Sequence, residues 1–267
     1  MQHKIIFFTY GNGQNFKYSR YHLKNLAINS EIFHKTYSFK FNDIDRNFRT
    51  KYKYIFDMKR GNGYWIWKVY FLKELLSQIS NNDLIVYMDA GSIFNNRGRK
   101  RFFEYVDMLT ASEFNNFRIK SLNGHIEKFY TVKETFDYFN IDQNSTYGNS
   151  LQFEAGHLIF KKDKKINQYI AEFFKAIDND NDLITDRYNH NQEPYFIENR
   201  HDQSLLSILS KIYGCVSIDN ETDFRENREI QYDYPFLALR RKNHGTKDKL
   251  KLITNYKKER IKPKYFI

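Results

Sequence analysis

Short apolar runs alternate along the chain with segments in which apolar residues recur at helical spacing. Residues 4–9 (KIIFFT) and 83–88 (DLIVYM) are continuous apolar runs, a pattern typical of strands buried on both faces. Apolar positions repeat every third or fourth residue over 18–28 and 64–79, which predicts helices there. This order of strand, helix, strand and helix indicates a mostly parallel sheet covered by helices.

The same alternation continues through the second half of the chain. Thr131 and Glu134 have the spacing of a capping box, and Gly214 is a typical C-cap after the last amphipathic segment. The polar residues 42–63 predict an irregular segment. Further strands are predicted at 31–39, 151–162, 215–218 and 236–241, and further helices at 97–109, 131–139, 164–177 and 201–214.

The length of 267 residues suits one large α/β domain, and no Gly/Ser-rich linker divides the chain. We therefore predict a single domain over residues 1–250 and a basic C-terminal tail over 251–267. Of the net charge of +11, residues 240–267 contribute most, with eleven Lys or Arg against two acidic residues. Such a tail suits an anionic membrane surface or a nucleic acid, although a solvated terminus explains the same composition.

The cysteine content and the apolar runs also bear on location. Cys215 is the single cysteine, which excludes an internal disulfide and is typical of a reducing compartment. The sequence has neither a secretory signal nor a run of about 20 apolar residues. We expect a cytoplasmic protein, held at the inner face of a membrane if its tail binds lipid.

The run over 83–88 ends on a carboxylate. Parallel sheets bind ligands beyond the carboxyl ends of their strands, where Asp89 is predicted to lie. The small residues Ala90 and Gly91 leave room for a ligand close to the backbone. An Asp that caps a turn gives the same pattern.

Three later segments contain further candidate residues. Within the predicted strand 151–162, the triplet Glu154, Ala155 and Gly156 interrupts the apolar pattern. A glycine inside a strand often marks the close approach of a ligand, although a bulge has the same effect.

The other two segments lie at a helix start and after the last strand. The polar run Arg200, His201, Asp202 and Gln203 lies at the start of the predicted helix 201–214, where Asp also serves as an ordinary first-turn residue. Carboxylate and amide groups of this kind hold sugar hydroxyls. His244 and Lys247 suit a metal and a phosphate, although a solvated basic loop has the same composition.

The order of these four segments resembles that of the GT-A glycosyltransferases, most of all the family 8 group. That group has Asp-x-Asp at a strand end, then an Asn-Ala-Gly strand, an Asp-Gln helix start and a His-x-x-Gly-x-x-Lys segment. Residues 61–68 (GNGYWIWK), ahead of VYMDAGS, are also similar to small bacterial and viral glycosyltransferases that carry Trp-x-Trp-Lys before Asp-Ala-Gly. The resemblance covers roughly residues 4–250.

This resemblance implies a mixed, mostly parallel GT-A-like sheet and a nucleotide-sugar donor, expected to be a UDP-sugar. The implied acceptor is a glycan or a lipid-linked saccharide. Asp202 would contact the donor sugar or, in an inverting reaction, act as the base. The nucleotide and its diphosphate are expected at Thr9, Tyr10, Gly11, Lys68, Asp89, Ala90, Gly91 and Lys247. The sugar and acceptor are expected at Trp65, Trp67, Glu154, Ala155, Gly156, His201 and Gln203.

The resemblance also implies a divalent metal, Mn²⁺ or Mg²⁺, bound by Asp89 and His244. Gly91 replaces the second aspartate of the family motif, and Val69 stands where proline usually follows Trp-x-Trp-Lys. Glycine has no side chain to ligate a metal. Either Asp89, His244 and phosphate oxygens hold the metal, or the metal is dispensable.

Two other classes of protein fit parts of the sequence. A nucleic-acid-binding protein would use the basic tail, but Asp89 and Asp202 would make the body a poor phosphate surface. We therefore expect no nucleic-acid partner. A dinucleotide-binding enzyme is prompted by Gly11 and Gly13 after the first strand, but Phe16 stands where the third glycine belongs.

Overall fold

The computed structural model describes residues 3–189, 191–223 and 233–239. Its strands are β1 (Ile5–Tyr10), β2 (Lys35–Phe39), β3 (Leu84–Met88), β4 (Ile93–Phe94), β5 (Asn116–Ile119), β6 (His157–Lys161), β7 (Val216–Ile218) and β8 (Phe236–Leu237). Its helices are α1 (Gln14–Asn29), α2 (Arg46–Lys51), α3 (Lys53–Phe56), α4 (Gly61–Tyr64), α5 (Ile66–Ser77), α6 (Arg99–Ala111), α7 (Lys133–Tyr138), α8 (Thr146–Asn149), α9 (Lys164–Asn179) and α10 (Asp202–Tyr213).

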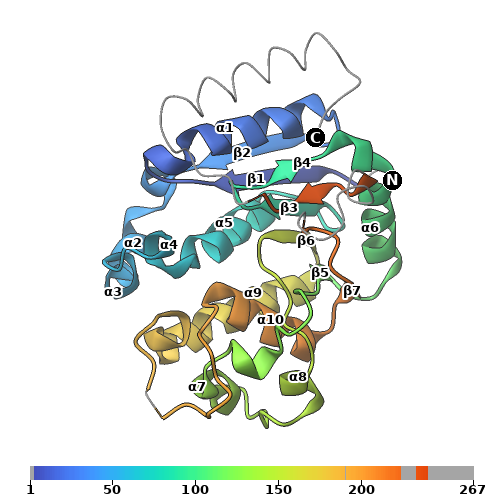
Figure 1. Ribbon diagram of the computed structural model, residues 1–267. Coiled ribbons are helices and arrows are strands. Elements are labelled where there is room, and N and C mark those ends of the chain that lie inside the picture. The colour runs from blue at the N-terminus through green and yellow to red at the C-terminus, as the bar shows by residue number, and fades with distance from the viewer. Residues whose placement is uncertain (1–2, 190, 224–232, 240–267) are drawn as a thin grey trace.

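A six-stranded sheet with the order β2-β1-β3-β6-β5-β7 forms the centre of the molecule (Figure 1). All of its strands run in the same direction except β6, which pairs antiparallel with both β3 and β5. Strands β4 and β8 form a separate antiparallel pair. The prediction of a mixed, mostly parallel sheet is confirmed.

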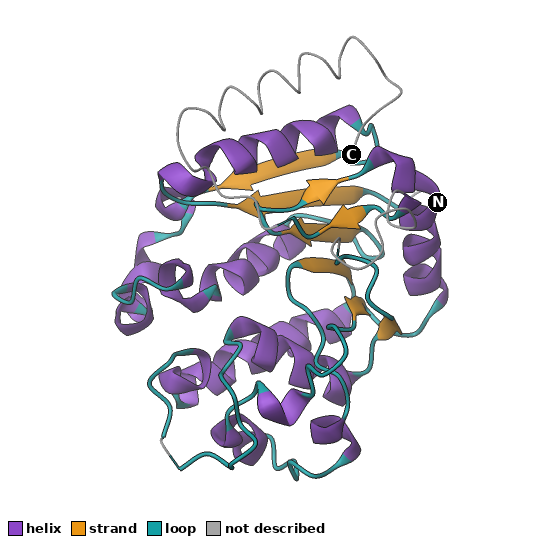
Figure 2. Cartoon of the chain, in the orientation of Figure 1, coloured by secondary structure: helices purple, strands orange, loops and turns teal. Residues whose placement is uncertain are grey.

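Helices cover both faces of this sheet (Figure 2). Side chains alternate along a strand, so Ile5 and Phe7 of β1 pack in one apolar core with α1 and α6. Ile6 and Phe8 point the other way, into the core that α5, α9 and α10 complete. Burial on both faces explains why β1 and β3 are continuous apolar runs.

Two local predictions differ from the structure. Residues 42–63 are not irregular but contain α2, α3 and the start of α4. The capping box is wrong: the N-cap of α7 is Val132, whose side chain cannot accept a hydrogen bond, and Thr131 lies one residue earlier with its hydroxyl donating to Glu127. Gly214 does end α10, with a φ of 77° that favours glycine.

The strand predicted over 151–162 begins only at His157. Glu154, Ala155 and Gly156 form the loop that leads into it. These three residues therefore precede the strand and do not interrupt it. This loop meets the end of β3, because β6 and β3 are antiparallel and Met88 pairs with His157.

The carboxyl ends of β1 and β3 lie at the same edge of the sheet, since these strands are parallel neighbours. Among the helices of residues 3–189, 191–223 and 233–239, none is long and apolar enough to span a bilayer. His244, Lys247 and the tail over 251–267 lie outside the described residues.

Candidate active site

A cavity of about 640 Å³ opens at the carboxyl ends of β1 and β3. Segments that are far apart in the sequence meet around it. They include residues 10–12, 60–62, 89–92, 154–157 and 200–203. The volume is in the range of pockets that enclose a ligand of several rings. The structure thus brings together three of the candidate segments of the sequence, those of Asp89, Glu154 and Asp202, whereas the segment of His244 and Lys247 lies outside the described residues.

Asp89 lies at the floor of this cavity, one residue after β3. Its backbone N–H donates a 2.8 Å hydrogen bond to the carbonyl of Gly156, and the hydroxyl of Tyr87 donates a 2.5 Å bond to Oδ1. A Cβ on residue 156 would lie 3.3 Å from Asp89 Oδ2, so glycine leaves that oxygen uncrowded. The turn around Ala90 and Gly91 closes through a 2.9 Å bond from the Ser92 N–H to the carbonyl of Asp89.

The end of β1 forms a second side of the cavity. The Tyr10 ring stacks on Trp67 with centroids 3.7 Å apart, and both rings line the cavity with Gly11. Burial raises the pKa of Tyr10, so its hydroxyl stays protonated at neutral pH. Thr9 is fully buried and does not line the cavity.

The segment between α3 and α5 has an unusual backbone. Residues 61–65 all have positive φ, from 47° to 91°. Left-handed backbone costs about 1–2 kcal/mol for each residue that has a Cβ. The indole of Trp67 holds this turn by donating a 2.8 Å bond to the Gly61 carbonyl. Asn12 donates a 3.4 Å bond to Asn62, which joins the turn to the loop after β1. Strained backbone of this kind is concentrated at functional sites.

A buried histidine connects the loop after β3 with the loop before β6. His157 Nδ1 lies 2.8 Å from Glu154 Oε1, and Nε2 lies 2.9 Å from the Ser92 hydroxyl. The carboxylate can only accept, so Nδ1 carries the proton. Thr222 donates a 3.0 Å bond to the other oxygen of Glu154. This chain of contacts fixes the two loops that lie on either side of Asp89.

Lys68 and Asp202 form a buried ion pair in the cavity wall. Lys68 Nζ donates bonds of 2.5 Å to Asp202 Oδ2 and 2.8 Å to the carbonyl of Ala155. Burial raises the pKa of Asp202 to about 6, the Lys68 ammonium opposes that rise, and the negative charge of Asp89 adds to it. Lys68 therefore already has Asp202 as an ion-pair partner before any ligand binds.

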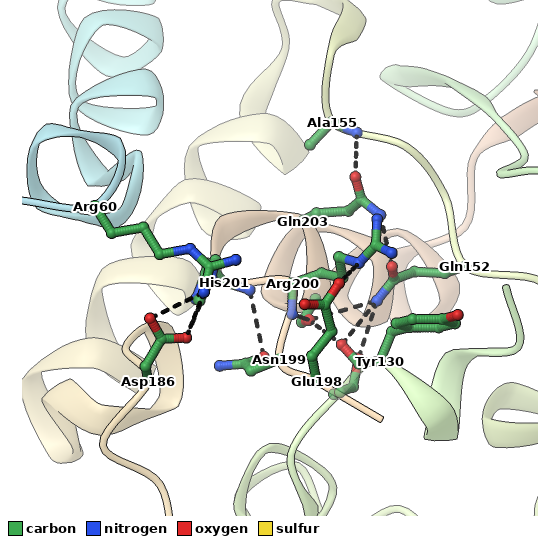
Figure 3. Close-up of polar contacts among 12 residues, drawn as sticks. Arg60, Tyr130, Gln152, Ala155, Asp186, Glu198, Asn199, Arg200, His201 and Gln203 are labelled. Carbon is green, nitrogen blue, oxygen red and sulfur yellow. Dashed lines mark hydrogen bonds and ion pairs between the residues drawn. The ribbon is translucent and has the colours of Figure 1, made fainter. Parts of the chain in front are cut away.

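His201 precedes α10 in a strained conformation, with φ 60° and ψ −122°. Its backbone N–H donates a 3.3 Å bond to Asn199 (Figure 3). Its Nδ1 donates to the Ile184 carbonyl at 3.1 Å, and Nε2 lies 3.6 Å from Asp186. Burial lowers the pKa of His201 to about 4, so the ring is neutral at pH 7. Trp65 stacks on this ring at 5.6 Å, which completes one wall of the cavity.

Two cationic residues also line the cavity: Arg60, which was not predicted, and Arg200, which belongs to the polar run at the start of the predicted helix. Arg60 donates to both oxygens of Asp186 at 3.0 Å, and Arg200 pairs with Glu198 at 2.8 Å. Arg200 directly precedes His201, so its position was an available signal. Nothing in the local sequence distinguishes Arg60 from other surface cations.

The metal prediction can be compared with the oxygen and nitrogen ligands of the site. Within residues 3–189, 191–223 and 233–239, no three His, Cys, Asp or Glu side chains converge on one metal position. The carboxylate of Asp89 could ligate a metal, whereas Gly91 has no side chain that could do so. The other predicted ligand, His244, lies outside the described residues, so the metal stays a prediction.

Comparisons with known proteins identify the fold. No family model matches the sequence, and no curated protein matches it. A solved glycosyltransferase involved in glycosylation of the major capsid of PBCV-1 is similar over 95% of this chain and 99% of its own, with 8% identity and a TM-score of 0.51. The bifunctional glycosyltransferase WbbM is similar over 89% of this chain and 46% of its own, with 10% identity and a TM-score of 0.50. The chain therefore has the GT-A-like fold that its sequence predicted.

Proposed function

We propose that the chain is a glycosyltransferase that moves a sugar from a nucleotide-diphosphate sugar, such as a UDP-sugar, to a glycan or lipid-linked saccharide. The observation that carries this proposal is one cavity, at the carboxyl ends of β1 and β3, that contains both Asp89 and the Lys68–Asp202 pair. Its place in a fold shared with two glycosyltransferases supports sugar transfer over other chemistry.

The cavity offers groups for each part of such a donor. The stacked rings of Tyr10 and Trp67 give the nucleotide an aromatic wall. Arg60 and Arg200 lie in the lining and could bind the diphosphate if its oxygens replaced Asp186 and Glu198 as their partners. Asp202 would accept a hydrogen bond from a sugar hydroxyl or, in an inverting reaction, the proton of the acceptor hydroxyl.

A divalent metal belongs to the same proposal. Asp89 and His244 would hold it, and a bound metal would neutralise charge on the leaving diphosphate. Membrane contact through the tail over 251–267 likewise stays a proposal, which would place the enzyme beside lipid-linked acceptors.

A hydrolysis screen tests the proposed function. Purified chain is incubated with a panel of nucleotide sugars in Mn²⁺, Mg²⁺ or EDTA, and the released nucleotide is measured. We expect turnover of at least one donor by the wild type and a loss of about 100-fold or more in Asp89→Asn. Asp219→Asn is the matched control, because that side chain is 91% exposed. No turnover and no binding of any donor would refute the proposal.

A further inference from the structure

Glu127 is a fully buried carboxylate that does not line the cavity. Its Oε1 accepts bonds of 2.6 Å from the Thr131 hydroxyl and 2.9 Å from Gln152 Nε2. Its Oε2 accepts a 2.7 Å bond from Lys211 and another from the Ser207 hydroxyl. An ionised carboxylate with four donors can only accept, so Glu127 fixes the direction of every hydrogen bond around it.

The amide of Gln152 has one allowed orientation beside this carboxylate. Its Nε2 faces Glu127 Oε1 at 2.9 Å and the Tyr130 carbonyl at 3.3 Å, and both of these groups only accept. The NH₂ group must therefore lie on this side, and Oε1 must point away. That Oε1 accepts a 2.6 Å bond from Gln203 Nε2.

The same constraint passes on to Gln203, which lines the cavity and lies between Gln152 and Ala155 (Figure 3). Because its NH₂ group is directed at Gln152, its carbonyl oxygen is the end that approaches Ala155. The Ala155 N–H donates to that oxygen at 3.3 Å, which is a long bond. A carbonyl oxygen has two lone pairs, so this one retains the capacity to accept from a ligand hydroxyl.

We propose that Glu127 and Gln152 are positioning residues, which orient the Gln203 amide so that the cavity presents an oxygen acceptor for a sugar hydroxyl. The choice of a sugar hydroxyl as the ligand rests on the proposed function. The coupling between the orientations of the Gln152 and Gln203 amides does not. Lys211 pairs with Glu127 at 2.7 Å. A neutral amide at position 127 would offer Gln152 either an oxygen or an NH₂ group, so the 3.3 Å contact with the Tyr130 carbonyl would be left to oppose a turn of the Gln152 amide.

A mutant cycle on stability tests the coupling without any donor. Gln203→Glu at pH 8 sets a carboxylate against Gln152 Oε1, so we expect the folding equilibrium constant to fall at least about tenfold. In the background Glu127→Gln/Lys211→Met, which removes both buried charges together, the Tyr130 carbonyl at 3.3 Å still opposes a turn of the Gln152 NH₂ group toward the carboxylate introduced at position 203, but the shorter contact with a carboxylate at position 127 no longer does. There the same substitution should cost at least about threefold less than it does in the wild type. Equal costs in the two backgrounds would overturn the proposal.

A kinetic arm tests the consequence for the ligand. Using UDP-glucose and UDP-galactose hydrolysis, we expect Glu127→Gln/Lys211→Met to lower kcat/KM about tenfold, the effect of one lost hydrogen bond. Thr131→Val removes one donor to Glu127 and a 3.1 Å contact with Gln152 Nε2 but keeps the carboxylate, so its kcat/KM should change less than about twofold. A tenfold loss in Thr131→Val as well would mean that Glu127 has only a structural role. Coupling in the stability cycle without any donor turnover would count against the proposed function alone.

Discussion

The protein buries two Lys–carboxylate pairs that differ in how fully the carboxylate is bonded. Lys68 and Asp202 are 2.5 Å apart with side chains 3% and 5% exposed, and Lys211 and Glu127 are 2.7 Å apart at 6% and 0%. Glu127 has three further side-chain donors, whereas Lys68 is the one side chain bonded to Asp202 among the described residues. The Lys68–Asp202 pair lines the cavity, and the Lys211–Glu127 pair does not.

This difference separates a structural charge from one that is available for chemistry. A carboxylate with all of its lone pairs occupied has no capacity left for a ligand. Asp202 keeps that capacity, and its pKa of about 6 brings its ionisation close to neutral pH. Burial and a lysine partner alone would not have distinguished the two pairs.

The largest expected effect comes from removing the lysines. Lys68→Met leaves Asp202 as a buried carboxylate without a cation, so we expect the free energy of unfolding to fall by about 3–5 kcal/mol. Lys211→Met should cost about 2 kcal/mol, because three donors still solvate Glu127. Urea unfolding of both variants at pH 8 measures the two values. Equal costs would show that the extra donors of Glu127 contribute nothing.

The next effect is on turnover. Asp202→Asn keeps the shape of the side chain but removes its negative charge, so we expect donor hydrolysis to fall about 100-fold. The variant also leaves Lys68 without its anion, which lowers stability. The double variant Asp202→Asn/Lys68→Met removes that charge as well and should be folded yet equally inactive. Wild-type turnover in either folded variant would exclude Asp202 from the chemistry.

The parts of the molecule that sequence predicted are those specified by local pattern. The apolar runs of β1 and β3 and the amphipathic α10 have one consistent structure, so Asp89 and Asp202 were placed at element ends before any contact was known. The left-handed turn over 61–65 was not predicted, because residues 61–63 fell in the segment expected to be irregular and the apolar spacing that begins at Trp65 placed residues 64 and 65 in an ordinary helix. A role for Glu127 was not predicted, because partners such as Lys211 are distant from it in the sequence.

The smallest expected effect is the pH dependence of Asp202. Its folded-state pKa of about 6 lies above the ordinary value of 3.8, so the folded protein binds more protons than the unfolded chain between about pH 4 and 6. The contribution of Asp202 to the free energy of unfolding therefore falls as pH rises through that window. Its ionised fraction rises about tenfold between pH 5 and 7, and donor hydrolysis should rise with it if the carboxylate acts in the reaction.

Two matched measurements isolate this group from the other carboxylates. The free energy of unfolding of the wild type and of Asp202→Asn is followed from pH 4 to 7. As pH increases, the value for the wild type should fall relative to that for Asp202→Asn. The rise in hydrolysis should have its midpoint near pH 6 in the wild type and higher in Lys68→Met, where the opposing ammonium is gone. A midpoint that stays in place when Lys68 is removed would assign the titration to another residue, because Lys68 is in direct contact with Asp202.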